Sequence, residues 1–267
     1  MVVLQPSENQ PLVVRETAAL FEVYPDRVPD ACSLYEIQHV DAFQWLNDAS
    51  ANCIHAVVTD PPYGLVEYTE KELTKLRNGN GGGIWRIPPS FDGCKRSPLP
   101  RFTVLGPDDK DALRRFFVRL ACGLMKVLVP GGHIMTVMPR SCWEPWGLFR
   151  KPCEGRVQDN LRKWGTGGLR RISRHEPFKD LIQSSPTRPE ERSIAPHPSL
   201  KPQRFLRQLV RASLPLETGI ILDPFMGSGS TIAAAAACGL LSIGLEIDAE
   251  YFHIAKTAIP KLAALRA

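Results

Sequence analysis

The chain has 267 residues, 43% of them hydrophobic and 23% charged, which is an ordinary composition for a globular protein with a sizeable core. Its net charge of +5 and pI near 8.9 suit a polyanionic partner without requiring one. No apolar run is long enough to span a bilayer, and the N-terminus does not resemble a signal peptide, so we expect a cytoplasmic protein. The seven cysteines show no C-x-x-C spacing, so we expect no zinc site and no other metal.

The first half of the chain begins with an extension and a buried strand. Residues 1–30 are rich in proline and are interpreted as an extension of the main domain, which we place at residues 31–267. The short run 53–59 is apolar and β-branched, which predicts a buried parallel strand. This strand ends directly at Asp60-Pro61-Pro62.

A long irregular stretch comes next. Residues 64–109 show little periodicity and are interpreted as an inserted loop, and loops of that length in compact domains are usually functional or disordered. Apolar residues at helical spacing between Leu113 and Leu124 then predict a helix. We expect this helix to end at Pro130-Gly131-Gly132 and a strand to follow over residues 133–138.

The second half alternates between strands and helices after a basic segment. Residues 140–196 contain many Arg and Lys with interleaved tryptophans and have no clear periodicity. A helix is predicted over residues 201–214, where Pro202 fits the first turn. Strands at 220–222 and 240–245 alternate with an alanine-rich helix and a final helix. This alternation predicts an α/β fold with a mostly parallel sheet and helices on both faces.

A glycine loop follows the strand at 220–222. Gly227 and Gly229 let the backbone turn tightly and approach a ligand closely, although a G-x-G turn alone is equally typical of a structural turn. No Gly-Lys-Ser/Thr follows, which argues against a P-loop, and the third glycine of a dinucleotide fingerprint would fall at Ile232. Asp223 offers a carboxylate to a cation or amine, and Glu246 ends the next strand, where an acid can bind both ribose hydroxyls. Together they predict a nucleoside cofactor without a pyrophosphate.

Asp60-Pro61-Pro62-Tyr63 stands where open α/β sheets bind their ligands, although a proline turn could also stand there. The exocyclic amine of a nucleobase is a poor nucleophile, because its lone pair is delocalised into the ring. The Asp60 carboxylate and the fixed Pro61 carbonyl can each accept one N–H and so localise that lone pair. Tyr63 offers a flat face on which an extruded base can stack.

Five segments of the chain carry a family resemblance. Asp60-Pro61-Pro62-Tyr63-Gly64 resembles the catalytic motif of the N6-adenine and N4-cytosine DNA methyltransferases. Residues 223–229 resemble that family's S-adenosylmethionine motif, 244–248 its ribose-binding strand end, and 197–202 the segment preceding the glycine loop. Val40-Asp41-Ala42-Phe43 is similar to its adenine-reading position. The catalytic motif precedes the glycine loop, as in the circularly permuted β group, so the resemblance implies a Rossmann-like methyltransferase fold.

The resemblance implies roles for single residues. Asp60 and Pro61, held by Pro62, would orient the target amine, and Tyr63 would stack the base. Glu246 would hold the cofactor ribose and Asp41 would lie near its adenine, while Lys201 would close the methionine end of the pocket. The implied cofactor-binding residues are Asp41, Lys201, Asp223, Phe225, Gly227, Gly229, Thr231 and Glu246.

The expected function is methylation of double-stranded DNA at specific sites, as in restriction–modification systems. Asp60 at the first motif position favours N6 of adenine, and N4 of cytosine is the alternative by the same mechanism. An RNA or protein amide methyltransferase and a non-catalytic DNA-binding module are weaker alternatives. Residues 140–196 are the expected target-recognition segment. The chain could act as a monomer or as a homodimer.

Overall fold

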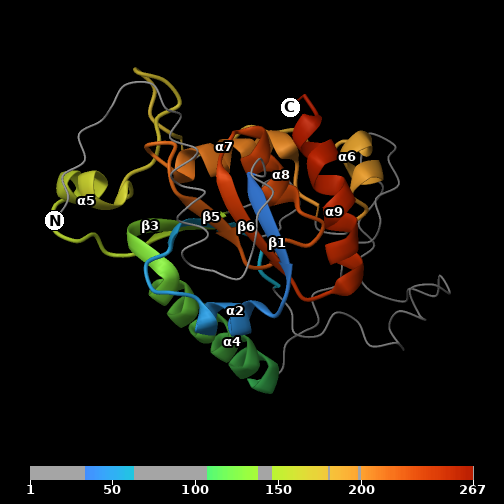
Figure 1. Cartoon of the computed structure of the whole chain (residues 1–267), viewed down its shortest axis with the longest axis horizontal. Helices are drawn as coiled ribbons and strands as arrows, with labels where there is room; N and C mark the ends of the chain where they lie inside the picture. Colours follow the sequence, from blue (N-terminus) through green and yellow to red (C-terminus); the bar gives the residue numbers. More distant parts are fainter. Residues whose placement is uncertain (1–33, 63–106, 138–145, 180, 198–199, 267) are drawn as a thin grey trace. The chain divides into compact units, whose positions relative to one another are not determined.

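A computed structural model describes residues 34–62, 107–137, 146–179, 181–197 and 200–266 of the chain (Figure 1). The expected N-terminal extension, most of the expected inserted loop, and Tyr63 lie outside these residues. The chain divides into two compact units, Met1–Pro61 with Cys122–Ala267 and Pro62–Ala121. The first unit contains every described strand and all described candidate site residues except Pro62.

Most predicted elements are confirmed to within a few residues. The described strands are β1 (Tyr35–His39), β2 (Ile54–Thr59), β3 (Leu128–Val137), β4 (Trp146–Arg150), β5 (Ile220–Asp223) and β6 (Leu241–Glu246). The described helices are α2 (Ala42–Asp48), α4 (Pro107–Val127), α5 (Val157–Trp164), α6 (Pro189–Ile194), α7 (Gln203–Ser213), α8 (Ser230–Ala237) and α9 (Ala249–Ala264). Pro202 is the residue that caps α7 rather than part of its first turn. Among these described helices, none is both long and apolar enough to pass through a bilayer.

The described strands form one sheet in the order β1-β6-β5-β2-β3-β4. Neighbouring strands from β1 to β3 are parallel, and β4 runs antiparallel to β3 at one edge of the sheet. β2 and β5 are buried along nearly their whole length, as expected of parallel strands that are covered on both faces. The carboxyl ends of β2, β5 and β6 therefore lie side by side, and Asp60 directly follows the first of them.

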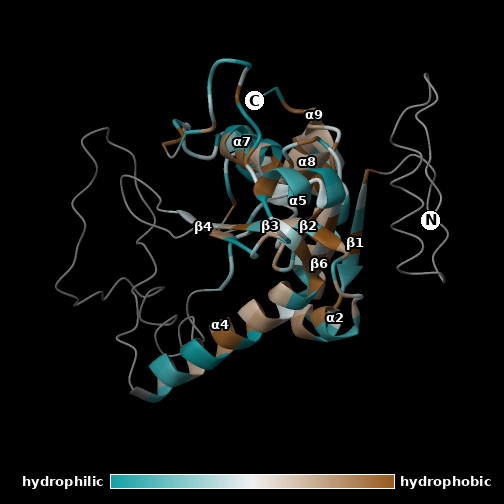
Figure 2. Cartoon of the chain, turned by 90° about the vertical axis from the view of Figure 1, so that its left-hand side faces the viewer, coloured by the Kyte–Doolittle hydropathy of each residue, from teal (hydrophilic) through white to brown (hydrophobic). Residues whose placement is uncertain are grey.

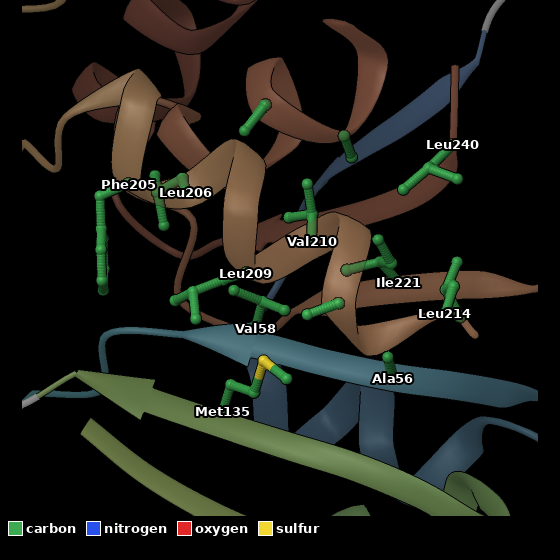
Figure 3. Packing of buried hydrophobic residues seen from close by; sticks show 13 residues of the cluster. Ala56, Val58, Met135, Phe205, Leu206, Leu209, Val210, Leu214, Ile221 and Leu240 are labelled. Carbon is green, nitrogen blue, oxygen red and sulfur yellow. The ribbon is translucent and has the colours of Figure 1, made fainter. Parts of the chain in front are cut away.

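Helices cover both faces of this sheet (Figures 1 and 2). On one face α7 contacts β2 and β3, α8 contacts β5 and β6, and α9 contacts β1 and β6, while α2 lies on the other face. Figure 3 shows Leu209 of α7 over Val58 of β2, with Met135 of β3 beside them, and all three are fully buried. Burying side chains of this size contributes about 1.5–3 kcal/mol each. This core therefore fixes the strand that leads to Asp60.

The prediction that Pro130-Gly131-Gly132 ends a helix is wrong. Helix α4 ends earlier, at Val127, and these three residues lie inside β3. The register of β2 against β3 shifts at this point, so β3 bulges where a proline and two glycines would otherwise interrupt the ladder. Gly131 takes a φ of +77°, which favours glycine. The Pro130 carbonyl accepts hydrogen bonds from Asn160 at 2.9 Å and Thr166 at 2.6 Å, which compensates for the irregular pairing.

Five described elements were not predicted from the sequence: β1 and α2 precede β2, and β4, α5 and α6 lie in the segment 140–196. Helix α5 contacts β3, and its fully buried Asn160 reaches Pro130 near the start of that strand. This is the amino end of the parallel strands, opposite to the edge that carries Asp60. Residues that follow α5 in the segment 140–196 approach the carboxyl edge. There the Thr187 hydroxyl donates a hydrogen bond to the Leu200 carbonyl at 2.8 Å.

Candidate active site

Asp60 and Pro61 directly follow β2 at the carboxyl edge of the sheet. Pro61 is buried, while the Asp60 side chain keeps 20% of its surface exposed. Lys201, only 10% exposed, places its Nζ 3.1 Å from Oδ2 of Asp60. Pro62 is exposed, and Tyr63 lies outside the described residues. The Asp60 side chain is thus partly exposed, while its Oδ1 is buried and its Oδ2 is held by an ammonium group.

Asp223 ends β5, the neighbour of β2, and is buried. Its Oδ1 accepts hydrogen bonds from the Thr59 hydroxyl at 2.8 Å and from the Phe225 amide at 3.1 Å. Burial raises the pKa of Asp223 from the ordinary 3.8 to about 6, because desolvation disfavours the charged carboxylate. Hydrogen bonds from Thr231 and Thr59 act against this rise in pKa, and the Asp60 carboxylate adds to it. A cationic ligand would favour the ionised form, so Asp223 suits an ammonium or sulfonium group.

Glu246 ends β6, and backbone amides hold both of its carboxylate oxygens. Oε2 accepts from the Gly227 amide at 2.9 Å, and Oε1 accepts from the Asp248 amide at 2.8 Å. These bonds fix the plane of the carboxylate and join the glycine loop to the end of β6. Each carboxylate oxygen can accept a second hydrogen bond. Glu246 can therefore bind the two hydroxyl groups of a ribose.

Gly227 and Gly229 have φ values of 53° and 88°, where a side chain would be strained. A Cβ on Gly227 would lie 2.9 Å from Nε2 of His197, whereas a Cβ on Gly229 would lie 2.5 Å from Cγ1 of Ile259 in α9. Gly229 is therefore required by the packing of α9 as well as by the turn. Between the two glycines, Ser228 is 1% exposed, and its hydroxyl has no hydrogen-bond partner within the described part of the chain. Buried hydroxyls normally have one, so the loop retains a polar group for a ligand or a water.

Asp41 caps the N-terminus of α2, where its Oδ1 accepts from the Gln44 amide at 2.9 Å. The preceding Val40 amide donates to the Glu246 carbonyl at 2.9 Å, so the start of α2 adjoins the end of β6. Asp41 thus lies beside the candidate ribose-binding residue while it stabilises a helix. Its role toward a nucleobase stays a prediction.

The structure places the described site residues of the first unit along the carboxyl edge of the sheet. Lys201 joins Asp60, the Phe225 amide joins Asp223, and the Gly227 amide joins Glu246. Sequence reasoning missed Thr59, whose hydroxyl links β2 to Asp223. The available signal was a hydroxyl at the last position of an otherwise apolar strand.

Comparison with protein families and solved structures agrees with this architecture. Residues 149–257 match the family model N6_N4_Mtase, described as DNA methylase. This stretch includes α7, the glycine loop and the end of β6, and Asp60 lies before it. The solved structure of the PvuII DNA methyltransferase, which is cytosine-N4-specific, has a TM-score of 0.51 at 12% identity and covers 87% of this chain and 89% of that chain. At this identity the likeness shows the fold alone.

Two curated relatives match shorter stretches. The Type II methyltransferase M2.LlaDCHI of Lactococcus lactis subsp. cremoris is 38% identical over 84 residues, which are 32% of this chain and 31% of the relative. The DNA adenine methyltransferase YhdJ of Escherichia coli (strain K12) is 46% identical over 58 residues, which are 22% of this chain and 19% of the relative. The chain thus spans less than a third of the length of either relative. The match over residues 149–257 covers less than half of the chain and shows that this part is similar to the N6-adenine and N4-cytosine DNA methyltransferases.

Proposed function

We propose that the chain transfers a methyl group from S-adenosylmethionine to the exocyclic amine of a flipped DNA base. The observation that supports this proposal is that two carboxylates in different environments, Asp60 after β2 and Asp223 at the end of β5, lie at the ends of neighbouring strands. Asp60 is partly exposed and paired with an ammonium group, whereas Asp223 is buried and linked to β2 through Thr59. The first can accept hydrogen bonds from a substrate amine, and the second can hold a cationic cofactor. The match of residues 149–257 to the DNA methylase family model supports this reaction class.

The residues at this edge fit S-adenosylmethionine. Glu246 presents a fixed carboxylate to a ribose, and the glycine loop keeps the Ser228 hydroxyl buried without a partner among the described residues. Asp223 offers a buried anion to a positive charge. When bound, the cofactor would supply a methyl group activated by a sulfonium sulfur. Phe225, Gly227, Gly229 and Thr231 surround it in this proposal, with Asp41 beside its adenine.

Catalysis in this proposal depends on the strand end after β2. The Asp60 carboxylate and the Pro61 carbonyl each accept one N–H of the target amine, which draws the nitrogen toward tetrahedral geometry and frees its lone pair. Pro62 restricts the backbone and so keeps that carbonyl aimed. Tyr63 stacks the extruded base. Methyl transfer to the amine is direct, without a covalent bond to the enzyme, and the surplus proton passes to water.

Adenine is the favoured target base. An aspartate at the first motif position, as at Asp60, favours N6 of adenine in the family that the motif resembles. The relative from Escherichia coli is a DNA adenine methyltransferase and shares 46% identity over its aligned stretch. Cytosine N4 is the alternative, because both amines require the same geometry.

The proposed partner is double-stranded DNA in the cytoplasm, and the motif order is that of the permuted β group. Basic residues in segments 64–109 and 140–196 would attract the phosphates. Helix α5 lies at the amino end of the sheet, so the parts of segment 140–196 outside α5 are the better candidates for contacts close to Asp60. Analytical ultracentrifugation with and without a DNA duplex distinguishes a monomer from a homodimer.

The test is transfer of tritiated methyl from S-adenosylmethionine to unmethylated duplex DNA, followed by nucleoside digestion and mass spectrometry. Labelled N6-methyladenine is the expected product, and labelled N4-methylcytosine would establish the alternative base. Label only in RNA or protein would refute DNA as the substrate. Cofactor binding without transfer to any of these would favour a non-catalytic DNA-binding module.

A further inference from the structure

The ion pair between Lys201 and Asp60 is unusually protected. Its partners expose only 10% and 20% of their side chains, and Nζ lies 3.1 Å from Oδ2. By contrast, Lys163 and Glu154 in the same unit form an ion pair whose partners are 57% and 51% exposed. Exposed pairs of the second kind contribute little, because solvent screens them and their long side chains stay mobile. The pair at Asp60 is confined and therefore defines the position of the carboxylate.

The backbone that carries Lys201 is itself anchored on two sides. Two residues later, the Gln203 amide donates to Oε1 of Glu191 at 2.9 Å, and Glu191 is only 1% exposed. The Gln203 side chain donates to the Ser230 carbonyl, at the start of α8, also at 2.9 Å. These bonds join the start of α7 to α6 and to the helix that follows the glycine loop. Lys201 therefore extends toward Asp60 from a fixed base.

The charges around Asp60 explain why a cation is needed there. Asp223 on β5 is a second carboxylate, close enough that the charge of Asp60 contributes to the raised pKa of Asp223. Two like charges at adjacent strand ends repel each other. The Lys201 ammonium offsets this repulsion and keeps Asp60 in one orientation at the end of β2.

We propose that Lys201 is a positioning residue for Asp60, an inference that rests on the function proposed above. Its ammonium holds Oδ2 and so fixes the orientation in which the carboxylate meets the target amine. A carboxylate has about four acceptor sites, so pairing with an ammonium does not prevent it from accepting an amine N–H. Lys201 acts in this way on the rate of methyl transfer.

This role differs from the one that the family resemblance implies, in which Lys201 closes the methionine end of the cofactor pocket. A residue that holds the cofactor changes the dissociation constant of S-adenosylmethionine. A residue that positions Asp60 changes kcat and leaves that constant nearly unaltered. The two roles are therefore separated by measuring both quantities on one variant.

The primary variant is Lys201→Met, which keeps the length of the side chain and removes its charge. We expect kcat for duplex DNA at saturating cofactor to fall by about 10- to 100-fold, since small misplacements of reacting groups have effects of this size. The dissociation constant of S-adenosylmethionine, measured by isothermal titration calorimetry, should stay within about twofold of the wild type. Lys201→Arg should recover most of the lost kcat, because it restores a cation. The control Lys261→Met, at an exposed lysine of α9 outside both basic segments, should change neither quantity.

A double-mutant cycle tests whether Lys201 acts through Asp60. Asp60→Asn alone should lower kcat, and adding Lys201→Met to it should produce little further loss. Full additivity of the two losses would overturn the proposal, as would a Lys201→Met variant with normal kcat and weakened cofactor binding. If Lys201→Met does not fold, the Lys201→Arg variant tests the proposal instead. A folded Lys201→Arg variant that binds the cofactor normally but has a 100-fold lower kcat would contradict positioning by a cation. A wild-type protein that methylates no DNA would refute the proposed function. The outcomes described for the Lys201 variants can be observed only with an active wild type, and they would refute only the role of Lys201.

Discussion

Two carboxylates that end neighbouring strands have opposite environments. Asp60 is one-fifth exposed and paired with Lys201, while Asp223 is buried and has a pKa of about 6. A cation is the ligand that best suits the second. In the proposed function, this difference would let one edge of the sheet bind a neutral amine and a positively charged cofactor at the same time.

Replacing Asp60 should separate catalysis from cofactor binding. Asp60→Ala removes an acceptor for the target amine, so methyl transfer should fall by about 10²-fold or more, as for other groups that stabilise developing charge. Affinity for S-adenosylmethionine should persist, because Glu246 and the glycine loop are unchanged. Tritium transfer and calorimetry on the same preparation measure both. Unchanged turnover would show that Asp60 takes no part in the reaction.

The raised pKa of Asp223 predicts how cofactor binding depends on pH. The ionised carboxylate binds a cation and the protonated one does not, so protons compete with the cofactor below a pH of about 6. We expect affinity to be constant from pH 7 to 8 and to fall by up to tenfold per pH unit below 6. Calorimetric titrations between pH 5 and 8 measure this directly. Asp223→Asn should bind more weakly at pH 7 and lose the dependence, and a flat wild-type profile would contradict the assigned role.

The acids of the site could be predicted from the sequence, but their partners could not. Asp60 and Glu246 each follow an apolar strand, and that position is a local signal. Thr59 and Lys201 act on residues far away along the chain, and the Thr59–Asp223 bond spans 164 positions. Such pairings depend on which strands become neighbours, which no local pattern specifies.

At the scale of elements, the glycine loop is fixed by contact with α9 as well as by its turn. Gly229 caps α8 with a positive φ, and Ile259 of α9 occupies the space that a side chain would need. The Gly227 amide then binds Glu246 at the end of β6. The glycine loop, α9 and the end of β6 are thus in contact with one another, and these contacts fix the geometry of the candidate cofactor site.

Gly229→Ala should therefore be more destabilising than an ordinary glycine replacement. Its Cβ would lie 2.5 Å from Ile259 at a φ of 88°, so strain and overpacking together should reduce the free energy of unfolding by about 2–4 kcal/mol. Gly239→Ala is a matched control, because Gly239 has a φ of 71° with nothing within 4 Å of an added Cβ. It should reduce stability by only about 1 kcal/mol, from backbone strain. Urea denaturation compares them, and equal losses would contradict the packing role of Gly229.

The misassigned end of α4 shows the limit of local signals at this scale. Pro-Gly-Gly normally stops a regular element, and the prediction followed that rule. Here Asn160 and Thr166, from a segment about 30 residues away, satisfy the Pro130 carbonyl and allow a bulged strand instead. The strands at β2, β5 and β6 were predictable because their apolar runs bury both faces, which is a property of each run by itself.

At the scale of the whole molecule, buried histidines link stability to pH. Burial lowers the pKa of His55 and of His133 from the ordinary 6.5 to about 4, and repulsion from Arg150 also lowers that of His133. The unfolded chain therefore binds protons more readily than the native protein between pH 6.5 and 4, so stability is lost as pH falls through this window. The raised pKa of Asp223 acts in the opposite sense between about pH 6 and 3.8, where the native protein holds the proton.

Urea denaturation at pH 7 and at pH 5 measures the net effect of these three groups on the free energy of unfolding. Each of the two histidines should destabilise the protein by on the order of 2 kcal/mol on going to pH 5, and Asp223 should offset about 1 kcal/mol, so a net loss of about 3 kcal/mol is expected. His133→Leu should reduce the pH dependence. Greater stability at pH 5 than at pH 7 would show that these histidines do not titrate as described.

The bond between Thr59 and Asp223 also has a consequence for protein synthesis. A ribosome adds about 5–20 residues per second, so roughly 10–30 s separate the making of Asp60 from the making of Asp223, 163 positions later. Through that interval β2 has no β5 to pair with, and the nascent chain carries its tetrapeptide without the acids of the cofactor site. Long-range parallel pairing of this kind also forms slowly after release. Under the proposed function, a nascent chain that has not yet reached Glu246 would lack the cofactor site and transfer no methyl group to DNA.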